Sequence, residues 1–194
     1  MSYIYFLFFA VLIPLLGVNV KIRGSILGTI IFFAVRYLFG FGALTFGIPT
    51  ACATLCWSVS TEKQTRYTNL FCGGINLLLP LSAMVLFYVH PVGKVAFVYS
   101  LYWLIPVVLY FFPRNIFNTA LSSTFIAHSV GSVIWLYTMP SIPEKWIALL
   151  PIVAFERFLC AMVSVLAILL FSRVFSILKL YKNNNAFSFV RNYL

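Results

Sequence analysis

Long apolar stretches separated by short charged segments are the feature that most constrains the fold of this sequence. Only 8% of the residues are charged and 63% are hydrophobic, whereas soluble proteins carry about 25% charged residues. In hydrocarbon every backbone polar group needs an internal partner, which a helix supplies, and no β-barrel alternation is present. The sequence therefore predicts an all-α fold, a polytopic transmembrane helical bundle of six to seven helices. The predicted spans cover residues 3–18, 25–39, 43–58, 69–89, 95–112, 117–137 and 146–172.

The domain organisation follows from the length of the chain. Its 194 residues leave no room for a separate soluble domain, so residues 1–178 are predicted to form the bundle. Residues 179–194 form a short basic and aromatic C-terminal tail, for which lipid contact and protein docking are alternative interpretations. The net charge of +10 is spread over the short segments between the spans and over this tail. This spread of charge does not form a basic face suited to nucleic acid, and the lipid bilayer is the expected partner.

The stretches at 25–39 and 43–58 leave the number of crossings open. Each is shorter than the ~20 residues that a full crossing needs. They predict either two thin helices or one crossing with a re-entrant piece. Seven crossings with a cytoplasmic C-terminus satisfy the positive-inside rule better, because Lys21 and Arg23 then join the other inner basic residues. We therefore expect a multi-pass protein of the cell membrane with its C-terminus in the cytoplasm.

Ionisable residues inside the spans are the first functional candidates, since lipid penalises them unless they have partners. In the stretch 117–137, Thr124, His128 and Ser132 recur every four residues and share one helix face. Small residues beside this face allow another helix to approach closely. His128 is therefore either a hydrogen-bonded packing residue or a group that binds a ligand or a proton.

Glu156, Arg157 and Arg36 are the charged candidates. Glu156 and Arg157 are adjacent, about 100° apart around their helix, so we expect each to face a different partner. Candidate partners for Glu156 are Arg36, Arg157 and His128. A structural ion pair and direct contact with a solute are both open interpretations. Arg36 either reaches the membrane interface or lies at the mouth of a cavity.

Asn76 and Trp135 complete the predicted site. Asn76 lies before Pro80 in the stretch 69–89, where it either serves the backbone or faces a ligand. Trp135, like Trp103, is placed either as an interfacial anchor or as a wall of an apolar pocket. Tyr99 and Trp146 are predicted to be interfacial anchors. The predicted substrate-binding residues are His128, Trp135, Glu156, Arg157, Arg36 and Asn76.

Several classes of chemistry are disfavoured by composition. The sequence has no Asp, which excludes chemistry that depends on paired aspartates, and two His with three Glu make a metal site unlikely to form. The cysteines lie inside spans without a CxxC pair, so buried inert thiols are expected. There is no Walker A sequence or nucleophile elbow. We expect no enzyme activity, catalytic residue, cofactor or metal, although a hydrolase or transferase using His128 is a weaker option.

The whole-chain character resembles the substrate-binding S component of energy-coupling-factor vitamin transporters. The segment 125–137 (FIAHSVGSVIWLY) and the helix around Glu156 and Arg157 carry this resemblance. It implies a small helical bundle that binds a vitamin-like solute and depends on separate membrane and ATPase subunits. The alternative is a non-transporting membrane subunit or assembly factor, whose buried charges pair with the helices of a partner.

Overall fold

The computed structural model describes residues 14–18, 22–38 and 47–177, and all regular structure in these ranges is helical. The all-α bundle is thereby confirmed for this part of the chain. Only the end of the predicted first span is included, and the predicted tail at 179–194 lies outside the described residues. In chain order the elements are η2 (Pro14–Val18), α2 (Ile22–Leu38), α3 (Ile48–Thr61), α4 (Arg66–Gly73), η4 (Gly74–Leu78), α5 (Leu79–Val89), α6 (Pro91–Val95), η5 (Phe97–Trp103), α7 (Leu104–Leu109), α8 (Ile116–Thr138) and α9 (Pro143–Ile177).

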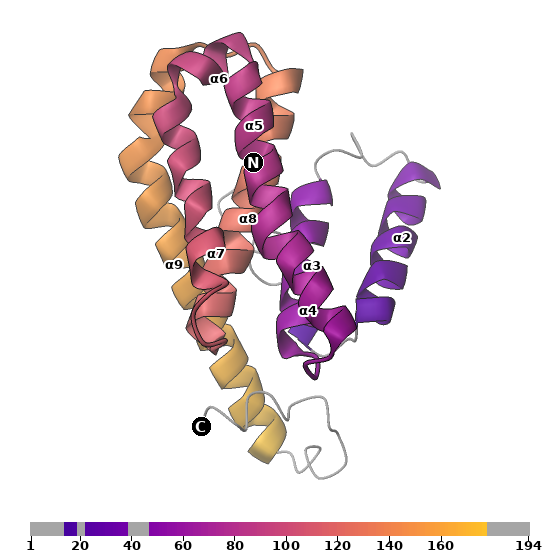
Figure 1. Cartoon of the computed structure of the whole chain (residues 1–194). Coiled ribbons are helices and arrows are strands. Elements are labelled where there is room, and N and C mark those ends of the chain that lie inside the picture. The colour runs from indigo at the N-terminus through magenta and orange to yellow at the C-terminus, as the bar shows by residue number, and fades with distance from the viewer. Residues whose placement is uncertain (1–13, 19–21, 39–46, 178–194) are drawn as a thin grey trace.

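The helices run up and down the bundle in alternation (Figure 1). Elements α4, η4 and α5 form one continuous leg, and α6, η5 and α7 return beside it. Helix α8 packs against α3, α5, α7 and α9, so it is the central helix of the bundle. Helix α2 contacts α3 and lies on the side away from α9.

Three helices are long and apolar enough to cross a membrane: Arg66–Val89, Ile116–Thr138 and Pro143–Arg173. Two shorter apolar helices cover Ile22–Ile31 and Phe97–Leu109. Helices α2 and α3 are separate, with 17 and 14 residues. At 1.5 Å per residue they are roughly 25 and 21 Å long, shorter than a hydrocarbon core of about 30 Å. The fold is that of a membrane protein, and the number of crossings stays a prediction.

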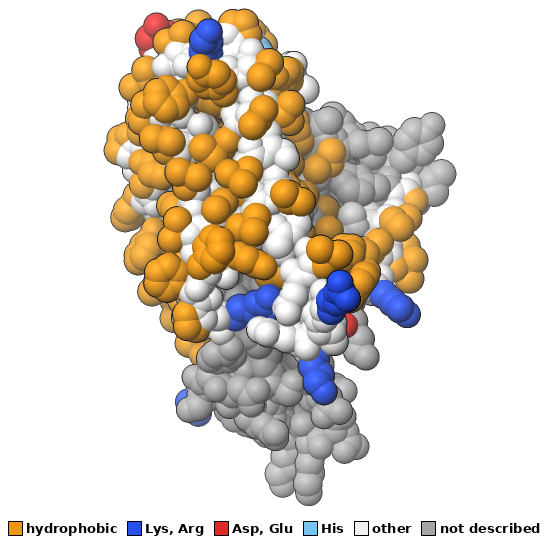
Figure 2. Space-filling model, in the orientation of Figure 1, with side chains coloured by type: hydrophobic (Ala, Val, Ile, Leu, Met, Phe, Trp, Pro, Cys, Tyr) orange, Lys and Arg blue, Asp and Glu red, His pale blue; other side chains and the backbone are white. Residues whose placement is uncertain are grey.

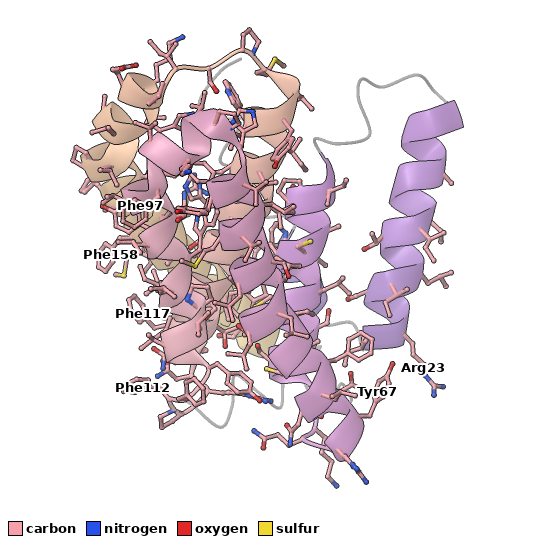
Figure 3. All side chains as sticks on the ribbon, turned by 45° about the horizontal axis from the view of Figure 1, so that its top comes forward. Arg23, Tyr67, Phe97, Phe112, Phe117 and Phe158 are labelled. Atoms are coloured by element: carbon pink, nitrogen blue, oxygen red, sulfur yellow. The ribbon has the colours of Figure 1, made fainter. Side chains whose placement is uncertain are left out.

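The surface agrees with a lipid environment. Figure 2 shows hydrophobic side chains over most of the bundle, with Lys and Arg gathered at its lower end. Figure 3 shows Phe97, Phe117 and Phe158 on one side of the bundle, where Phe97 and Phe158 are exposed. The rings of Phe117 and Phe158 have centroids 6.0 Å apart. An apolar exposed face of this kind fits contact with lipid chains.

Hydrogen-bonding side chains fix where several helices begin. Thr65 and Thr68 form a capping box at the start of α4, in which Thr68 N donates to Thr65 Oγ1 at 3.2 Å and Thr65 N to Thr68 Oγ1 at 2.7 Å. Asn115 Oδ1 accepts from Asn118 N at 2.7 Å at the start of α8. These caps give partners to backbone N–H groups that the first helical turn leaves unpaired.

Two predicted helices contain irregular turns that the sequence analysis did not anticipate. The stretch 69–89 includes the π-helical turn η4, and much of the stretch 95–112 is the 3₁₀ helix η5. Pro80 has no N–H for the carbonyl of Asn76, four residues earlier, and its ring would crowd that carbonyl in a regular α-helix. The π turn occurs at this position and widens the helix there.

A close approach at Gly93 gives a test of the packing between α5, α6 and α8. A methyl group at this position would overlap the backbone carbonyl of Phe87 and lie 3.1 Å from Leu136 Cδ2. Overpacking of this kind costs about 1–3 kcal/mol, so Gly93→Ala should lower the midpoint of thermal unfolding in mild detergent. Gly28→Ala is the control, because nothing lies within 4 Å of its added methyl group. Equal midpoints for Gly93→Ala and the wild type would contradict this packing.

Candidate functional site

The predicted polar face of α8 brings His128 to an aromatic partner. His128 Nε2 lies 2.9 Å from the hydroxyl of Tyr99 in η5. Ser132, one turn further along α8, also interacts with the Tyr99 hydroxyl. Thr124 Oγ1 instead donates to the carbonyl of Leu121 in its own helix at 2.9 Å. His128 therefore forms a contact between elements, and Thr124 Oγ1 also lies 3.5 Å from the carbonyl of Arg157 in α9.

Four buried aromatic side chains, Phe87, Tyr99, Trp103 and Trp146, form what we call the aromatic cage. Tyr99 has its ring centroid 4.9 Å from that of Trp146 and 5.8 Å from that of Phe87. Phe87 meets the rings of Trp103 and Trp146 edge-on, each at 5.2 Å. These distances are those of favourable aromatic pairs. The cage joins α5, η5 and α9 beside His128.

The cage contains two buried hydrogen-bond donors without acceptors. The indole nitrogens Nε1 of Trp103 and Trp146 are inaccessible to solvent and have no partner among the described residues. Buried polar groups in proteins are nearly always paired, so each exception requires an explanation. Two such donors in one aromatic cluster indicate a place where an acceptor is missing.

Glu156 and Arg157 form an ion pair with each other. Arg157 Nη2 lies 3.0 Å from Glu156 Oε2, with side-chain exposures of 8% for Arg157 and 34% for Glu156. This pair confirms Arg157 as one of the three candidate partners of Glu156, whereas the expectation that the two residues would face different partners was wrong. It considered only the angle between the two Cα positions, and both side chains are long enough to bend toward each other.

Arg157 also links this pair to the cage. Its carbonyl lies 3.5 Å from Oγ1 of Thr124, one turn before His128 on α8. We call Tyr99, His128, Glu156 and Arg157 the polar cluster. The cluster combines a hydrogen-bonded histidine and an ion pair next to the aromatic cage.

The other predicted site residues lie elsewhere. Trp135 is 55% exposed on α8, outside the cage. Asn76 donates from Nδ2 to the carbonyl of Cys72 at 3.0 Å and accepts from Cys56 Sγ at 3.9 Å. Arg36 lies in α2, and its side chain is outside the described structure. The structure thus brings together His128, Glu156 and Arg157, and separates Asn76 and Trp135 from them.

Two hollows among the described residues have linings that do not include His128, Glu156 or Arg157. An open apolar groove of about 470 Å³ lies between α3, the η4–α5 leg and α8. A smaller polar cavity of about 20 Å³ borders Asn76 and Arg114. Within the polar cluster, Tyr99 packs against the cage rings of Phe87 and Trp146.

Sequence reasoning missed part of the cage. Tyr99 and Trp146 were predicted to be interfacial anchors, but both are buried. Trp103 was one of two tryptophans considered as a pocket wall, and it is the one that lies in the cage. The spacing of Tyr99 and Trp103 by four residues, the same as that of Thr124 and His128, was the available signal.

Comparisons with known proteins do not add to this geometry. No family model, no curated protein and no solved structure matches the chain. Within the described residues, no three His, Cys or Glu side chains are grouped closely enough to hold a metal ion. The resemblance to S components stays a prediction, and the functional argument depends on the site itself.

The hydrogen bond between Tyr99 and His128 can be tested by removing one hydroxyl. Tyr99→Phe leaves the imidazole nitrogen buried without this partner, which typically costs about 1–3 kcal/mol. We expect a lower midpoint of thermal unfolding in detergent. Tyr88→Phe is the matched control, since Tyr88 is exposed and is expected to change stability by less than about 0.5 kcal/mol. Similar midpoints for the two variants would argue against a structural role for the bond.

Proposed function

We propose that this chain is a multi-pass membrane protein that binds a small organic solute at the polar cluster. The observation that carries the proposal is the pair of acceptor-free indole nitrogens of Trp103 and Trp146 beside Tyr99 and His128. An unpaired buried donor costs about 1–3 kcal/mol. A solute that offers acceptor atoms removes this cost, and its binding is favoured accordingly.

The surroundings of these donors define the chemistry of the solute. The rings of Phe87 and Trp146 suit a planar or apolar body, because aromatic faces and edges pack well against such groups. His128 and Glu156 orient polar groups of the solute, and Arg157 supplies positive charge nearby. The solute class is therefore a small, largely apolar organic molecule with hydrogen-bond acceptors, in keeping with a vitamin-like compound.

Translocation requires an energy source outside this sequence, which contains no Walker A motif. The proposed mechanism is binding in the bundle followed by release, driven by movement of partner subunits. Membrane and ATPase subunits are the partners that the resemblance to S components implies. Binding at the cage does not depend on them, so it can be measured with the chain alone.

The distribution of charge supports an orientation in the cell membrane. Lys63, Arg66 and Arg114 lie at the end of the bundle where α3 and α7 finish and α4 and α8 begin. Lys94 and Lys145 lie at the opposite end. The positive-inside rule assigns the more basic end to the cytoplasm. Helix α9 finishes at that end, which agrees with a cytoplasmic C-terminus.

Solute binding is tested by purification in mild detergent, followed by mass spectrometry of the extracted small molecules. We expect the wild type to retain a solute, and His128→Gln and Glu156→Gln to retain about tenfold less or none, since each removes a polar contact. His90→Gln and Glu144→Gln are matched controls, because the His90 side chain contacts Tyr137 and accepts from Val92 N, and Glu144 is exposed in the first turn of α9. Retention of the same solute at the same level in all four variants would remove the proposed roles.

A second candidate function rests on the partial exposure of Glu156. Its carboxylate is 34% exposed in the middle of α9, between the exposed side chains of Ile152 and Leu159. A carboxylate at this depth favours contact with a polar group of another helix. This observation supports a non-transporting membrane subunit or assembly factor, in which Glu156 pairs with a partner protein.

Co-purification separates the two functions. If this chain is a subunit or assembly factor, one membrane protein should co-purify with it in stoichiometric amount and no solute should be found. Glu156→Gln should then lose that protein, and Glu144→Gln should retain it. A solute without a stoichiometric partner would contradict the subunit interpretation. Loss of the partner in both glutamate variants would show that Glu156 is not its contact.

A further inference from the structure

A small cavity lined by both polar and apolar residues lies at the basic end of the bundle, away from the cage. It is formed where α3, the α4–η4 leg, α7 and α8 meet. Its volume is about 20 Å³, which is enough for about one water molecule or one oxygen atom of a larger group. Its lining residues on α8, Asn118, Thr119 and Ser122, lie six to ten residues before His128, about 9 to 15 Å along the helix axis. The cavity is therefore separate from the polar cluster.

The cavity wall offers hydrogen-bond donors and no carboxylate. Thr119 and Ser122 are 4% and 5% exposed, and both line the cavity. Both hydroxyls border the cavity together with the amides of Asn76 and Asn118. The amide nitrogens of Asn76 and Asn118 donate to the carbonyls of Cys72 and Pro113. The two hydroxyls are the groups suited to an oxygen acceptor that enters the cavity.

Arg114 places a positive charge at the same cavity. Its Nη2 donates to Asn69 Oδ1 at 3.3 Å, and its guanidinium lines the cavity. A guanidinium beside neutral donors favours an oxyanion over a neutral ligand.

We propose that this cavity binds the oxyanion of a phosphate group, with one oxygen inside and the others at the mouth. One oxygen fits the space available, and Thr119 and Ser122 donate to it. The remaining oxygens face Arg114. Lys63 is exposed at the same end of the bundle and raises the local concentration of anions. The phosphate belongs either to an anionic phospholipid headgroup at the membrane surface or to a free phosphate ion.

The test uses the full chain in detergent with two probes, inorganic phosphate and short-chain phosphatidylglycerol, and measures binding by titration calorimetry. Arg114→Gln should weaken binding about ten- to a hundredfold, the effect of losing a charged hydrogen bond. Arg114→Lys should retain part of the affinity because the charge remains. Ser122→Ala should weaken binding by a smaller factor, since it removes one neutral donor.

Arg66→Gln is the matched control, since this exposed arginine lies at the same end of the bundle but does not line the cavity. Binding of both probes, lost in Arg114→Gln and kept in Arg66→Gln, supports a phosphate site open to either source. Binding of phosphatidylglycerol alone assigns the site to a lipid headgroup, and binding of inorganic phosphate alone assigns it to the free ion. Absence of binding, or equal losses in Arg114→Gln and Arg66→Gln, overturns the proposal.

Discussion

The close packing of the central helix α8 is the interaction on which the rest of this bundle depends. In lipid, burying apolar surface between helices gives no hydrophobic driving force for association. The helices associate through van der Waals contact and hydrogen bonds between them. Small side chains on α8 make both available. Ser123 Oγ donates to the carbonyl of Ala53 in α3 at 3.3 Å, and a Cβ at Gly131 would lie 3.5 Å from Pro49. Ala120 is fully buried at the same interface. The other helices are positioned around this narrow core.

The same packing explains why the aromatic cage differs from the rest of the interior. Hydroxyl groups on α8 and α9 reach carbonyls of their own helices, as Ser129 does with Ile126 at 2.8 Å and Ser164 with Cys160 at 2.9 Å. An indole is too large and too rigid to turn back in this way. Trp103 therefore depends on a partner outside its own helix, and the cluster around it consists of aromatic and aliphatic side chains. Unpaired donors accumulate where large aromatic side chains meet, and this is the chemical character on which the proposed solute site rests.

Local sequence patterns predict where the helices lie along the chain, but they do not determine which helix faces pack against each other. The four-residue spacing of Thr124, His128 and Ser132 identified the face of α8 that contains the site. It could not identify Tyr99, because an aromatic residue near a span end is equally typical of an interfacial anchor. Trp135 lies seven residues after His128, nearly at the same angle, but His128 is itself at the edge of the buried face. A larger side chain at that angle therefore turns outward. The irregular turns near Pro80 and Pro106 were missed because proline permits several local solutions.

Under the proposed function, the position of the cage determines how a solute would reach it. Phe87 lies two residues before the end of α5, and Trp146 lies in the first turns of α9, so both are at the end of the bundle opposite Arg114. Tyr99 and Trp103 share the 3₁₀ helix η5, whose hydrogen-bond geometry is poorer than that of an α-helix. Movement of η5 alone would displace two walls of the cage together while α8 stays in place. Access from the less basic end through η5 therefore requires the smallest rearrangement of the packed core.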